Sequence, residues 1–271
     1  MAKIKFKKMH GSGNDFILID NRDGQIRYED AKGLAERLCR RKYNIGADGL
    51  ILIEDSQKAS FKWRFFNADG SEAEMCGNGG RCAARFAYLS EIAPNEMSFE
   101  TIAGIIHARV TDSRVKLELS RPWGTGLDVS LFVDDKSIIV HHINTGVPHA
   151  VVFCADLEHA PVVELGRKIR WHEMFQPAGT NVNFVKVADK GKIFIRTYER
   201  GVEDETLACG TGSVASAIIA ALKNMCQAPV SVVTRGGEEL RAYFSLKEQE
   251  IRDVYLEGNA VSVYSGILDE G

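Results

Sequence analysis

The sequence predicts an α+β fold with strongly curved sheets, and three observations support this class. Short segments in which β-branched and aromatic residues alternate with polar ones outnumber the helical segments. Strands and helices do not alternate regularly, which argues against a parallel sheet built from βαβ units. In addition, one cysteine–glycine pattern occurs twice, 133 positions apart in a chain of 271 residues.

Strands are expected along the whole chain. The first ten residues alternate lysine with Ile4 and Phe6, as an exposed strand does. Further alternating or apolar runs predict strands at residues 49–54, 60–66, 105–111, 114–120, 137–143, 149–154, 181–187, 192–198, 230–234, 242–246 and 260–266.

Four segments are expected to be helices. Residues 30–41 place Leu34 and Leu38 on one face, and residues 161–170 open with a proline, which suits a first helical turn. The other two helices follow Cys76 and Cys209. Each of these begins with a glycine-rich stretch and continues as an apolar helical pattern.

The chain is expected to form two domains that arose by duplication. At an offset of 133, Cys76 aligns with Cys209, and the aromatic, acidic and glycine positions around them align as well. Residues 120–127 contain one proline and two glycines, which makes them the best linker candidate. The expected domains are 1–122, joined by the C-terminal strand 260–271, and 123–259. Duplication of this kind places two equivalent sites face to face where the domains meet.

Composition and charge exclude several functions. The net charge is only −3 and basic residues are dispersed, so no nucleic-acid partner is expected. No apolar run approaches the roughly 20 residues that span a bilayer, and the N-terminal residues do not resemble a signal peptide. We therefore expect a cytoplasmic protein that does not enter a membrane.

The six cysteines are expected to be free thiols that bind no metal. In a reducing compartment, disulfides are rare. Five residues separate Cys76 from Cys82, which is wider than the usual zinc spacing, and no matching Cys or His pair follows them.

A cysteine at a helix N-terminus is expected to be chemically active. The unpaired N–H groups and the helix dipole there stabilise a thiolate, which lowers the thiol pKa, and they also bind anions such as a carboxylate. Two such helices could stabilise an enolate-like species while two thiols remove and return the proton at its Cα. This chemistry is racemisation or epimerisation by two bases, and it needs no pyridoxal phosphate or other cofactor.

Six segments in order along the chain resemble the diaminopimelate epimerase family. They are MHGSGNDFILID, NIGADGLI, FNADGSEAEMCGNGGRC, GVPHAVVF, GTNVNFV and YERGVEDETLACGTG. The resemblance implies interconversion of LL- and meso-2,6-diaminopimelate in lysine and peptidoglycan precursor biosynthesis. It also implies two pseudo-symmetric domains, each a curved sheet or barrel around a central helix, and a homodimer.

The resemblance also implies a role for each residue of a candidate site. Cys76 and Cys209 would be the acid/base thiols, and His149 and Glu199 would flank them and tune their pKa values. The reacting carboxylate would be bound by Gly77, Asn78, Gly210 and Thr211. The distal amino-acid end would be held by Asn14, Asn67, Asn181 and Arg200, and Glu199 would also contact the substrate.

The sequence departs from the family pattern at two positions, and two alternative functions remain open. Many family members carry glutamine at the position of Gly49 and asparagine at the position of Val147, so recognition of the distal end of the substrate is open. One alternative is another racemase of the same fold, such as a proline-type enzyme. The other is a non-catalytic redox switch in which Cys76 and Cys209 form a regulatory disulfide.

Overall fold

The computed structural model describes residues 3–247 and 250–268, and its contacts divide the chain into two compact units. Unit 1 comprises Met1–Leu117 with Gly258–Gly271, and unit 2 comprises Glu118–Glu257. The predicted domain limits, 1–122 with 260–271 and 123–259, stay a prediction. Residues 1–2, 248–249 and 269–271 of those domains lie outside the described residues.

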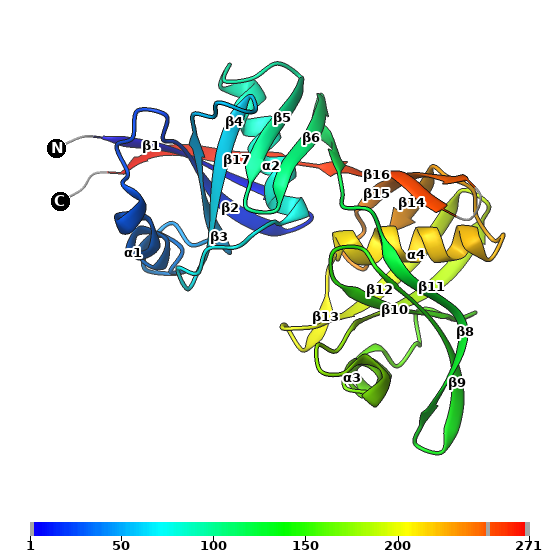
Figure 1. The fold of residues 1–271 in the computed structure, drawn as a ribbon. Helices are drawn as coiled ribbons and strands as arrows, with labels where there is room; N and C mark the ends of the chain where they lie inside the picture. The colour runs from blue at the N-terminus through cyan, green and yellow to red at the C-terminus, as the bar shows by residue number, and fades with distance from the viewer. Residues whose placement is uncertain (1–2, 248–249, 269–271) are drawn as a thin grey trace. The chain divides into compact units, whose positions relative to one another are not determined.

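The described residues of unit 1 form a mixed sheet in the order β17-β1-β2-β3-β4-β5-β6-β7 (Figure 1). The last strand, β17, lies antiparallel to the first, β1, so that the two ends of the chain meet in one sheet. The strands are β1 (Ile4–Gly11), β2 (Asn14–Asp20), β3 (Gly49–Glu54), β4 (Phe61–Asn67), β5 (Glu96–Thr101), β6 (Gly104–Thr111), β7 (Arg114–Glu118) and β17 (Val261–Leu268).

Unit 2 contains a second mixed sheet, in the order β8-β9-β10-β11-β12-β14-β15-β16. The short strand β13 pairs with β12 beside this order. The strands are β8 (Trp123–Val133), β9 (Lys136–Asn144), β10 (Pro148–Phe153), β11 (Asn181–Asp189), β12 (Lys192–Glu199), β13 (Asp204–Thr206), β14 (Val230–Val233), β15 (Glu239–Lys247) and β16 (Glu250–Asn259).

The two sheets have the same sequence of strand directions. From β17 to β6 in unit 1, successive pairs are antiparallel, antiparallel, parallel, antiparallel, parallel and antiparallel. The pairs from β8 to β15 in unit 2 follow the same series. In both sheets one further antiparallel pair completes the order. This correspondence confirms the predicted α+β class with two pseudo-symmetric halves.

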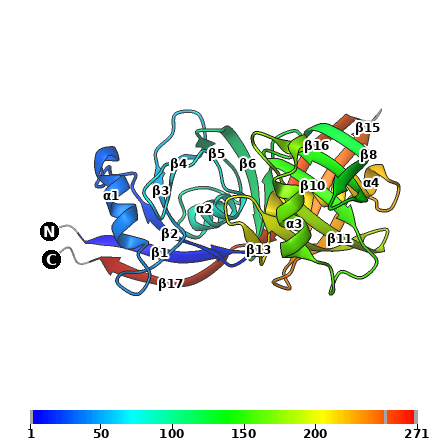
Figure 2. The same cartoon turned by 90° about the horizontal axis from the view of Figure 1, so that it is seen from below.

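Each sheet curves around one central helix that follows a cysteine. In unit 1 this helix is α2 (Gly77–Leu89), which is seen nearly end-on inside the strands in Figure 2. In unit 2 it is α4 (Gly210–Leu222), in which ten of thirteen residues are buried. A helix that is apolar on all sides is stable only when protein surrounds it. Alanine, glycine and serine fill most of α4, so the strands can approach its backbone closely.

The remaining helices cover the outer faces of the sheets. In unit 1, α1 (Tyr28–Leu38) packs Leu34 and Leu38 over the buried side chains of β2 and β3. In unit 2, α3 (Val162–Arg170) packs Val162 and Ile169 over β10 to β12. A short 3-10 helix, η1 (Glu173–Phe175), follows α3. These layers enclose most of the central helices, with Cys209 buried at the start of α4 and Cys76 half-buried at the start of α2.

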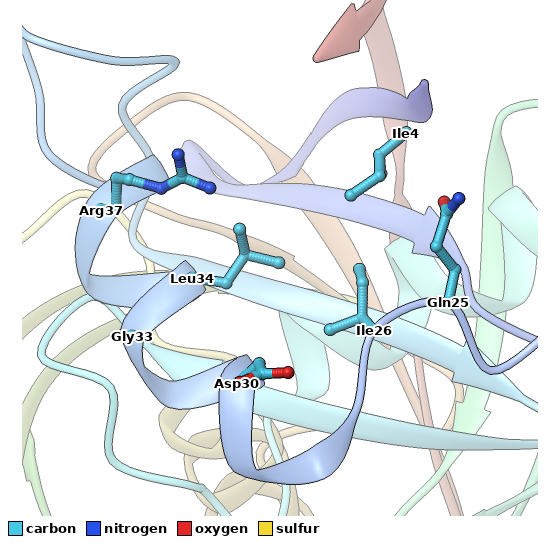
Figure 3. A pocket seen from close by; sticks show the side chains of 7 residues that line it. All are labelled: Ile4, Gln25, Ile26, Asp30, Gly33, Leu34 and Arg37. Atoms are coloured by element: carbon cyan, nitrogen blue, oxygen red, sulfur yellow. The ribbon is translucent and has the colours of Figure 1, made fainter. Parts of the chain in front are cut away.

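A pocket of about 470 Å³ lies between α1 and β1 in unit 1 (Figure 3). Seven described residues line it, namely Ile4, Gln25, Ile26, Asp30, Gly33, Leu34 and Arg37. None of the candidate site residues is among them. The candidate site is therefore identified by the chemistry of the two helices that follow Cys76 and Cys209, and not by this pocket.

The structure corrects several details of the predicted elements. Residues 123–127, which were expected to be part of a linker, belong to β8, whose register against β9 shifts near Gly126 and obscures the alternating pattern. Strands β2, β5, β13 and β16 were not predicted as strands, and α1 begins and ends two to three residues earlier than expected. Within the described residues, no helix is long and apolar enough to cross a membrane.

Candidate active site: two cysteine-capped helices

Cys76 is the N-cap residue of α2. Its backbone is extended, with φ −145° and ψ 118°, and its sulfur accepts the Gly79 N–H at 3.5 Å. Serine, threonine, asparagine or aspartate usually fills this position, because an acceptor there pairs with an otherwise unpaired helix N–H. Here a sulfur does so, which places a half-buried thiol where the helix dipole favours negative charge.

The amide of Asn14 lies beside the Cys76 sulfur and has a fixed orientation. Asn14 Nδ2 donates to the Asp48 carboxylate at 2.6 Å. An ionised carboxylate can only accept hydrogen bonds, so the Asn14 atom that faces it must be the nitrogen. Asn14 Oδ1 therefore faces the other way, towards Cys76 Sγ at 3.7 Å and Asn78 Nδ2 at 3.4 Å. Arg41 holds Asp48 in turn, through an ion pair of 2.7 Å. Asp48 is a positioning residue that the sequence pattern did not reveal.

Arg81 ties the start of α2 to neighbouring chain segments. Its side chain is fully buried and donates to Asn78 Oδ1 at 2.9 Å, Ser12 Oγ at 2.7 Å and the Asn259 carbonyl at 3.2 Å. These bonds fix Asn78, one of the residues expected to bind the reacting carboxylate. An added Cβ at Gly77 would meet no described atom within 4 Å, so the helix terminus is open at that point.

Asn67 and Gly49 lie opposite each other at the ends of β4 and β3. Asn67 Nδ2 donates to Ser71 Oγ at 3.0 Å, which leaves its side chain near the turn that leads to Cys76. A Cβ at Gly49 would lie 2.4 Å from the Phe65 ring and 2.7 Å from the Phe66 carbonyl oxygen. The Phe65 ring thus occupies the space that a side chain at position 49 would need, and this explains why glycine is found there.

Cys209 is the N-cap residue of α4, the position that Cys76 occupies in α2. Its backbone is again extended, with φ −123° and ψ 110°, and the helix that it precedes has the same thirteen-residue length as α2. Its sulfur lies 3.6 Å from Thr211 Oγ1. Asn183 Oδ1 and Cys209 Sγ would lie 2.3 Å and 3.2 Å from an added Cβ at Gly212, so glycine is required for this close packing.

The pKa of Cys209 differs from the expectation for a helix N-terminus. Burial and, to a smaller extent, the nearby Glu199 charge raise the pKa of this thiol to about 12, against hydrogen bonds from Thr211 and Gly212 that lower it. The predicted lowering is therefore wrong for Cys209 in this state. Desolvation of a charged sulfur outweighs the helix dipole, because the thiol is buried and its carboxylate neighbour disfavours a second negative charge.

Glu199, Arg200 and Asn181 lie close together at adjoining ends of β11 and β12. Burial raises the pKa of Glu199 above its ordinary value. The Arg200 N–H donates to Asn181 Oδ1 at 2.8 Å, and its guanidinium donates to the Ala178 carbonyl at 3.1 Å. Asn181 Nδ2 also donates to the Pro148 carbonyl at 3.2 Å, which connects the adjacent strand β10.

His149 on β10 is buried and lies opposite Asn181 in the register of β10 and β11. Burial, together with the smaller effect of the Arg200 charge, lowers the pKa of His149 to about 3. Its Nδ1 lies 3.1 Å from the amide nitrogen of Asn183, a residue that was not predicted to belong to the site. Asn183 lies two positions after Asn181 on one strand, so the alternation of a strand could have indicated it.

The predicted residues thus fall into two groups, one in each unit. In unit 1, direct contacts link Cys76, Asn14 and Asn78, with Gly77 between them in sequence and Asn67 on β4. In unit 2, the group contains Cys209, Gly210 and Thr211 at α4, and His149, Asn181, Glu199 and Arg200 on the strands. Among the described residues, no group of three or more His, Cys, Asp or Glu side chains is arranged to hold a metal ion.

Comparison with known proteins agrees with this arrangement. The family model for diaminopimelate epimerase matches residues 6–121 and 141–263. A diaminopimelate epimerase of Aquifex aeolicus is 48% identical over 98% of both chains, and one of Archaeoglobus fulgidus is 43% identical over 98% of this chain and 96% of its own.

Solved structures with low sequence identity share the fold. A phenazine biosynthesis protein of the PhzF family from Bacillus anthracis superposes with a TM-score of 0.71 at 14% identity, over 99% of both chains. A probable proline racemase from Agrobacterium radiobacter superposes with a TM-score of 0.69 at 16% identity, over 99% of this chain and 93% of its own. Sequence identity, the family model and the paired cysteine helices agree, and the chain belongs to the diaminopimelate epimerase family.

Proposed function

We propose that this protein interconverts LL- and meso-2,6-diaminopimelate, with Cys76 and Cys209 as the two acid/base groups. One observation carries the proposal. Two thiols occupy the same N-cap position on equivalent helices in two sheets of the same strand order. Membership of the diaminopimelate epimerase family supports the substrate.

In the proposed reaction, a thiolate on one face of the substrate removes the proton from Cα, and the two electrons of that C–H bond pass into the adjacent carboxylate. A thiol on the opposite face then donates its proton to Cα, which inverts the configuration. After one turnover, the first cysteine is a thiol and the second is a thiolate, so the roles are exchanged. The raised pKa of Cys209 supports its assignment as the proton donor at the start.

The negative charge that develops on the substrate carboxylate needs hydrogen-bond donors. We propose that the backbone N–H groups of Gly77, Asn78, Gly210 and Thr211 supply them, together with the dipoles of α2 and α4. Donors of this kind stabilise the transition state more than the ground state, because the carboxylate gains charge as the proton leaves. The distal end of the substrate would be held by Asn14, Asn67, Asn181, Glu199 and Arg200, with Arg200 pairing with the distal carboxylate.

We further propose that the enzyme acts in the cytoplasm as a homodimer and without a cofactor. A mechanism that requires two reduced cysteines is suited to a reducing compartment. The subunit number can be measured by light scattering during size-exclusion chromatography. For the cofactor, treatment with a chelator and with hydroxylamine should leave turnover unchanged. Inhibition that a metal ion or pyridoxal phosphate reverses would contradict the two-thiol mechanism.

The direct test is an assay of the purified, reduced protein with LL-diaminopimelate, in which the meso isomer is followed by chiral chromatography. We expect conversion by the wild-type protein and a loss of about 10²- to 10⁴-fold in kcat for Cys76→Ser and Cys209→Ser. Cys154→Ser is the matched control, since the Cys154 thiol donates to the carbonyl of Val185 on β11, away from both helix N-termini in sequence, and should retain activity. Conversion of proline but not of diaminopimelate would favour the proline-type alternative, and no turnover of either would favour the redox switch.

A further inference from the structure

The buried amide of Asn183 makes four contacts within the candidate site of unit 2. Its side chain is fully buried on β11. Nδ2 donates to the Ala150 carbonyl at 3.0 Å and lies 3.1 Å from His149 Nδ1. Oδ1 accepts the Thr197 hydroxyl at 2.9 Å and packs against Gly212 in the first turn of α4. The amide thus joins three strands to the helix that Cys209 caps.

The orientation of this amide follows from its partners. A backbone carbonyl can only accept, so the atom of Asn183 that faces Ala150 must be the nitrogen. The opposite orientation would place two oxygens 3.0 Å apart and would also require the Thr197 hydroxyl to face a nitrogen. Because the Asn183 nitrogen carries two hydrogens and one points to Ala150, the other points to His149.

This orientation determines the tautomer of His149. A donor at Asn183 requires that His149 Nδ1 carries a lone pair, so in the neutral ring the proton is on Nε2. Among the described residues, Nε2 is buried and has no hydrogen-bond partner. A buried N–H without a partner is costly and is rarely retained unless a ligand or a changed state supplies the acceptor.

The surroundings of His149 indicate which acceptor fits. The cation of Arg200 acts on the same imidazole, so a negatively charged group would interact favourably with both side chains. We propose that Asn183 is a positioning residue that holds His149 as the Nε2–H tautomer, so that this buried imidazole donates a hydrogen bond to an anionic group in the site. The anion is either a carboxylate of the substrate or the thiolate of Cys209. This inference rests on the proposed function for the identity of that anion, but not for the tautomer.

The tautomer can be measured in the free wild-type protein by long-range nitrogen–proton NMR of ¹⁵N-histidine, with His149 assigned from His149→Gln. We expect a protonated Nε2 and an unprotonated Nδ1 throughout the range from pH 6 to 9. A proton on Nδ1, or an equal mixture of tautomers, would overturn the inference. This measurement does not depend on activity, so its result stands even if the protein fails to epimerise diaminopimelate.

Two substitutions test the role of Asn183 itself. Asn183→Asp replaces the donor by an acceptor and should move the proton to His149 Nδ1, with a loss of about 10- to 100-fold in kcat and a smaller change in KM. Asn21→Asp is the control, because Asn21 is another buried amide whose partners, the Ile26 backbone and the Glu54 carboxylate, lie in unit 1 and outside the candidate site. A wild-type tautomer in Asn183→Asp, or an equal loss of kcat in both variants, would contradict the positioning role.

A second variant avoids the buried charge of aspartate. In Gly212→Ala, the new Cβ would displace the Asn183 oxygen, and the same shift of the His149 signals towards a mixture of tautomers is expected. Gly33→Ala on α1 is the matched control, since an added Cβ there meets no described atom within 4 Å and should change neither the signals nor kcat. Unchanged His149 signals in Gly212→Ala would show that Asn183 does not govern the tautomer.

The two possible anions give different spectra. If a substrate carboxylate is the acceptor, adding diaminopimelate to the inactive Cys76→Ser variant should shift the His149 Nε2–H signal downfield. If the Cys209 thiolate is the acceptor, the same downfield shift should appear in the ligand-free wild-type protein as Cys209 loses its proton at alkaline pH, and Cys209→Ser should abolish it. Either result supports the donor role, and the absence of both would refute it.

Discussion

Asn14 Oδ1 lies 3.7 Å from the sulfur of Cys76, while the nitrogen of the same amide is held by Asp48 at 2.6 Å. The Cys76 thiol therefore has an acceptor for its proton on one side and a donor, the Gly79 N–H, on the other. These two contacts stabilise different protonation states: the acceptor favours the thiol and the donor favours the thiolate. In the proposed mechanism Cys76 alternates between these two states, and each contact would stabilise one of them.

Replacing Asp48 tests whether the orientation of Asn14 matters. In Asp48→Ala, the Asn14 amide is free to rotate and to present its nitrogen to Cys76. Since a hydrogen bond to a charged group contributes about 1.5–3 kcal/mol, and water partly replaces this exposed one, we expect a loss of about tenfold in kcat/KM. The measurement is steady-state kinetics in both reaction directions.

Asp20→Ala is the control for this change. Asp20 lies at the far end of β2 and pairs with Arg22 on the surface at 2.8 Å, so its removal should leave kcat/KM within twofold of wild type. Equal kinetics of Asp48→Ala and wild type would show that the Asn14 orientation is not important for turnover.

The buried imidazole of His149 predicts a loss of stability in acid. Its pKa in the folded protein is about 3, whereas the unfolded value is close to the ordinary 6.5. Below pH 6.5 the unfolded state therefore binds a proton that the folded state does not, so the free energy of unfolding falls as pH decreases from 6.5 towards 3. Arg200, whose charge acts on the same ring, strengthens this effect. Urea denaturation at a series of pH values measures the slope.

His149→Gln should make this slope shallower, whatever it does to the absolute stability, because glutamine does not titrate. His159→Gln is the control, since His159 is an exposed side chain that pairs with Asp156 at 2.8 Å. A slope in His149→Gln as steep as in wild type would show that another group causes the acid sensitivity.

Mild oxidation is expected to inactivate the enzyme by joining Cys76 to Cys209. Two groups that act on opposite faces of one carbon must approach each other, and a disulfide forms when the Cα atoms are about 4.4 to 6.8 Å apart. Because the pKa of Cys209 is about 12, we expect inactivation to be slow near neutral pH and faster as pH rises. Excess reductant should restore activity, and bound diaminopimelate should protect.

Peptide mapping of the oxidised protein identifies the linked cysteines. The proposed site predicts a peptide that contains both Cys76 and Cys209. Inactivation with a Cys76–Cys82 link instead, or with overoxidised cysteine alone, would contradict the expectation that the two thiols act on one substrate carbon.

The sequence was sufficient to predict the most regular features. The two cysteine–glycine segments predicted helix starts at Cys76 and Cys209, and both residues are N-caps of thirteen-residue helices. Alternation predicted most strands, since burial on one face imposes a period of two. Strand β8 was missed because Gly124 and Gly126 interrupt that period, and β16 was missed because exposed charges such as Arg252 and Asp253 lie along it.

Features that depend on tertiary packing could not be predicted. The helix dipole at Cys209 is local and visible in the sequence, whereas the burial that raises its pKa depends on how the chain packs around it. Asp48 and Asn183 likewise act through side chains 34 residues away, at Asn14 and His149. An isolated Asp in a sequence is most often part of a turn, so only the structure identifies Asp48 as a positioning residue. Strand alternation from Asn181 could have indicated Asn183, but its contact with His149 is known only from the structure.

The proposal that two cysteines serve opposite faces of one carbon is tested most directly by running the reaction in deuterated water and measuring the deuterium content of substrate and product at low conversion. With LL-diaminopimelate as substrate, mass spectrometry of each isomer at low conversion measures the deuterium at the inverted Cα. Because one thiol removes the proton and the other delivers deuterium, we predict a labelled meso product and a remaining LL substrate that is largely unlabelled. Equal early labelling of both isomers would show that a single base serves both faces and would contradict the two-cysteine account.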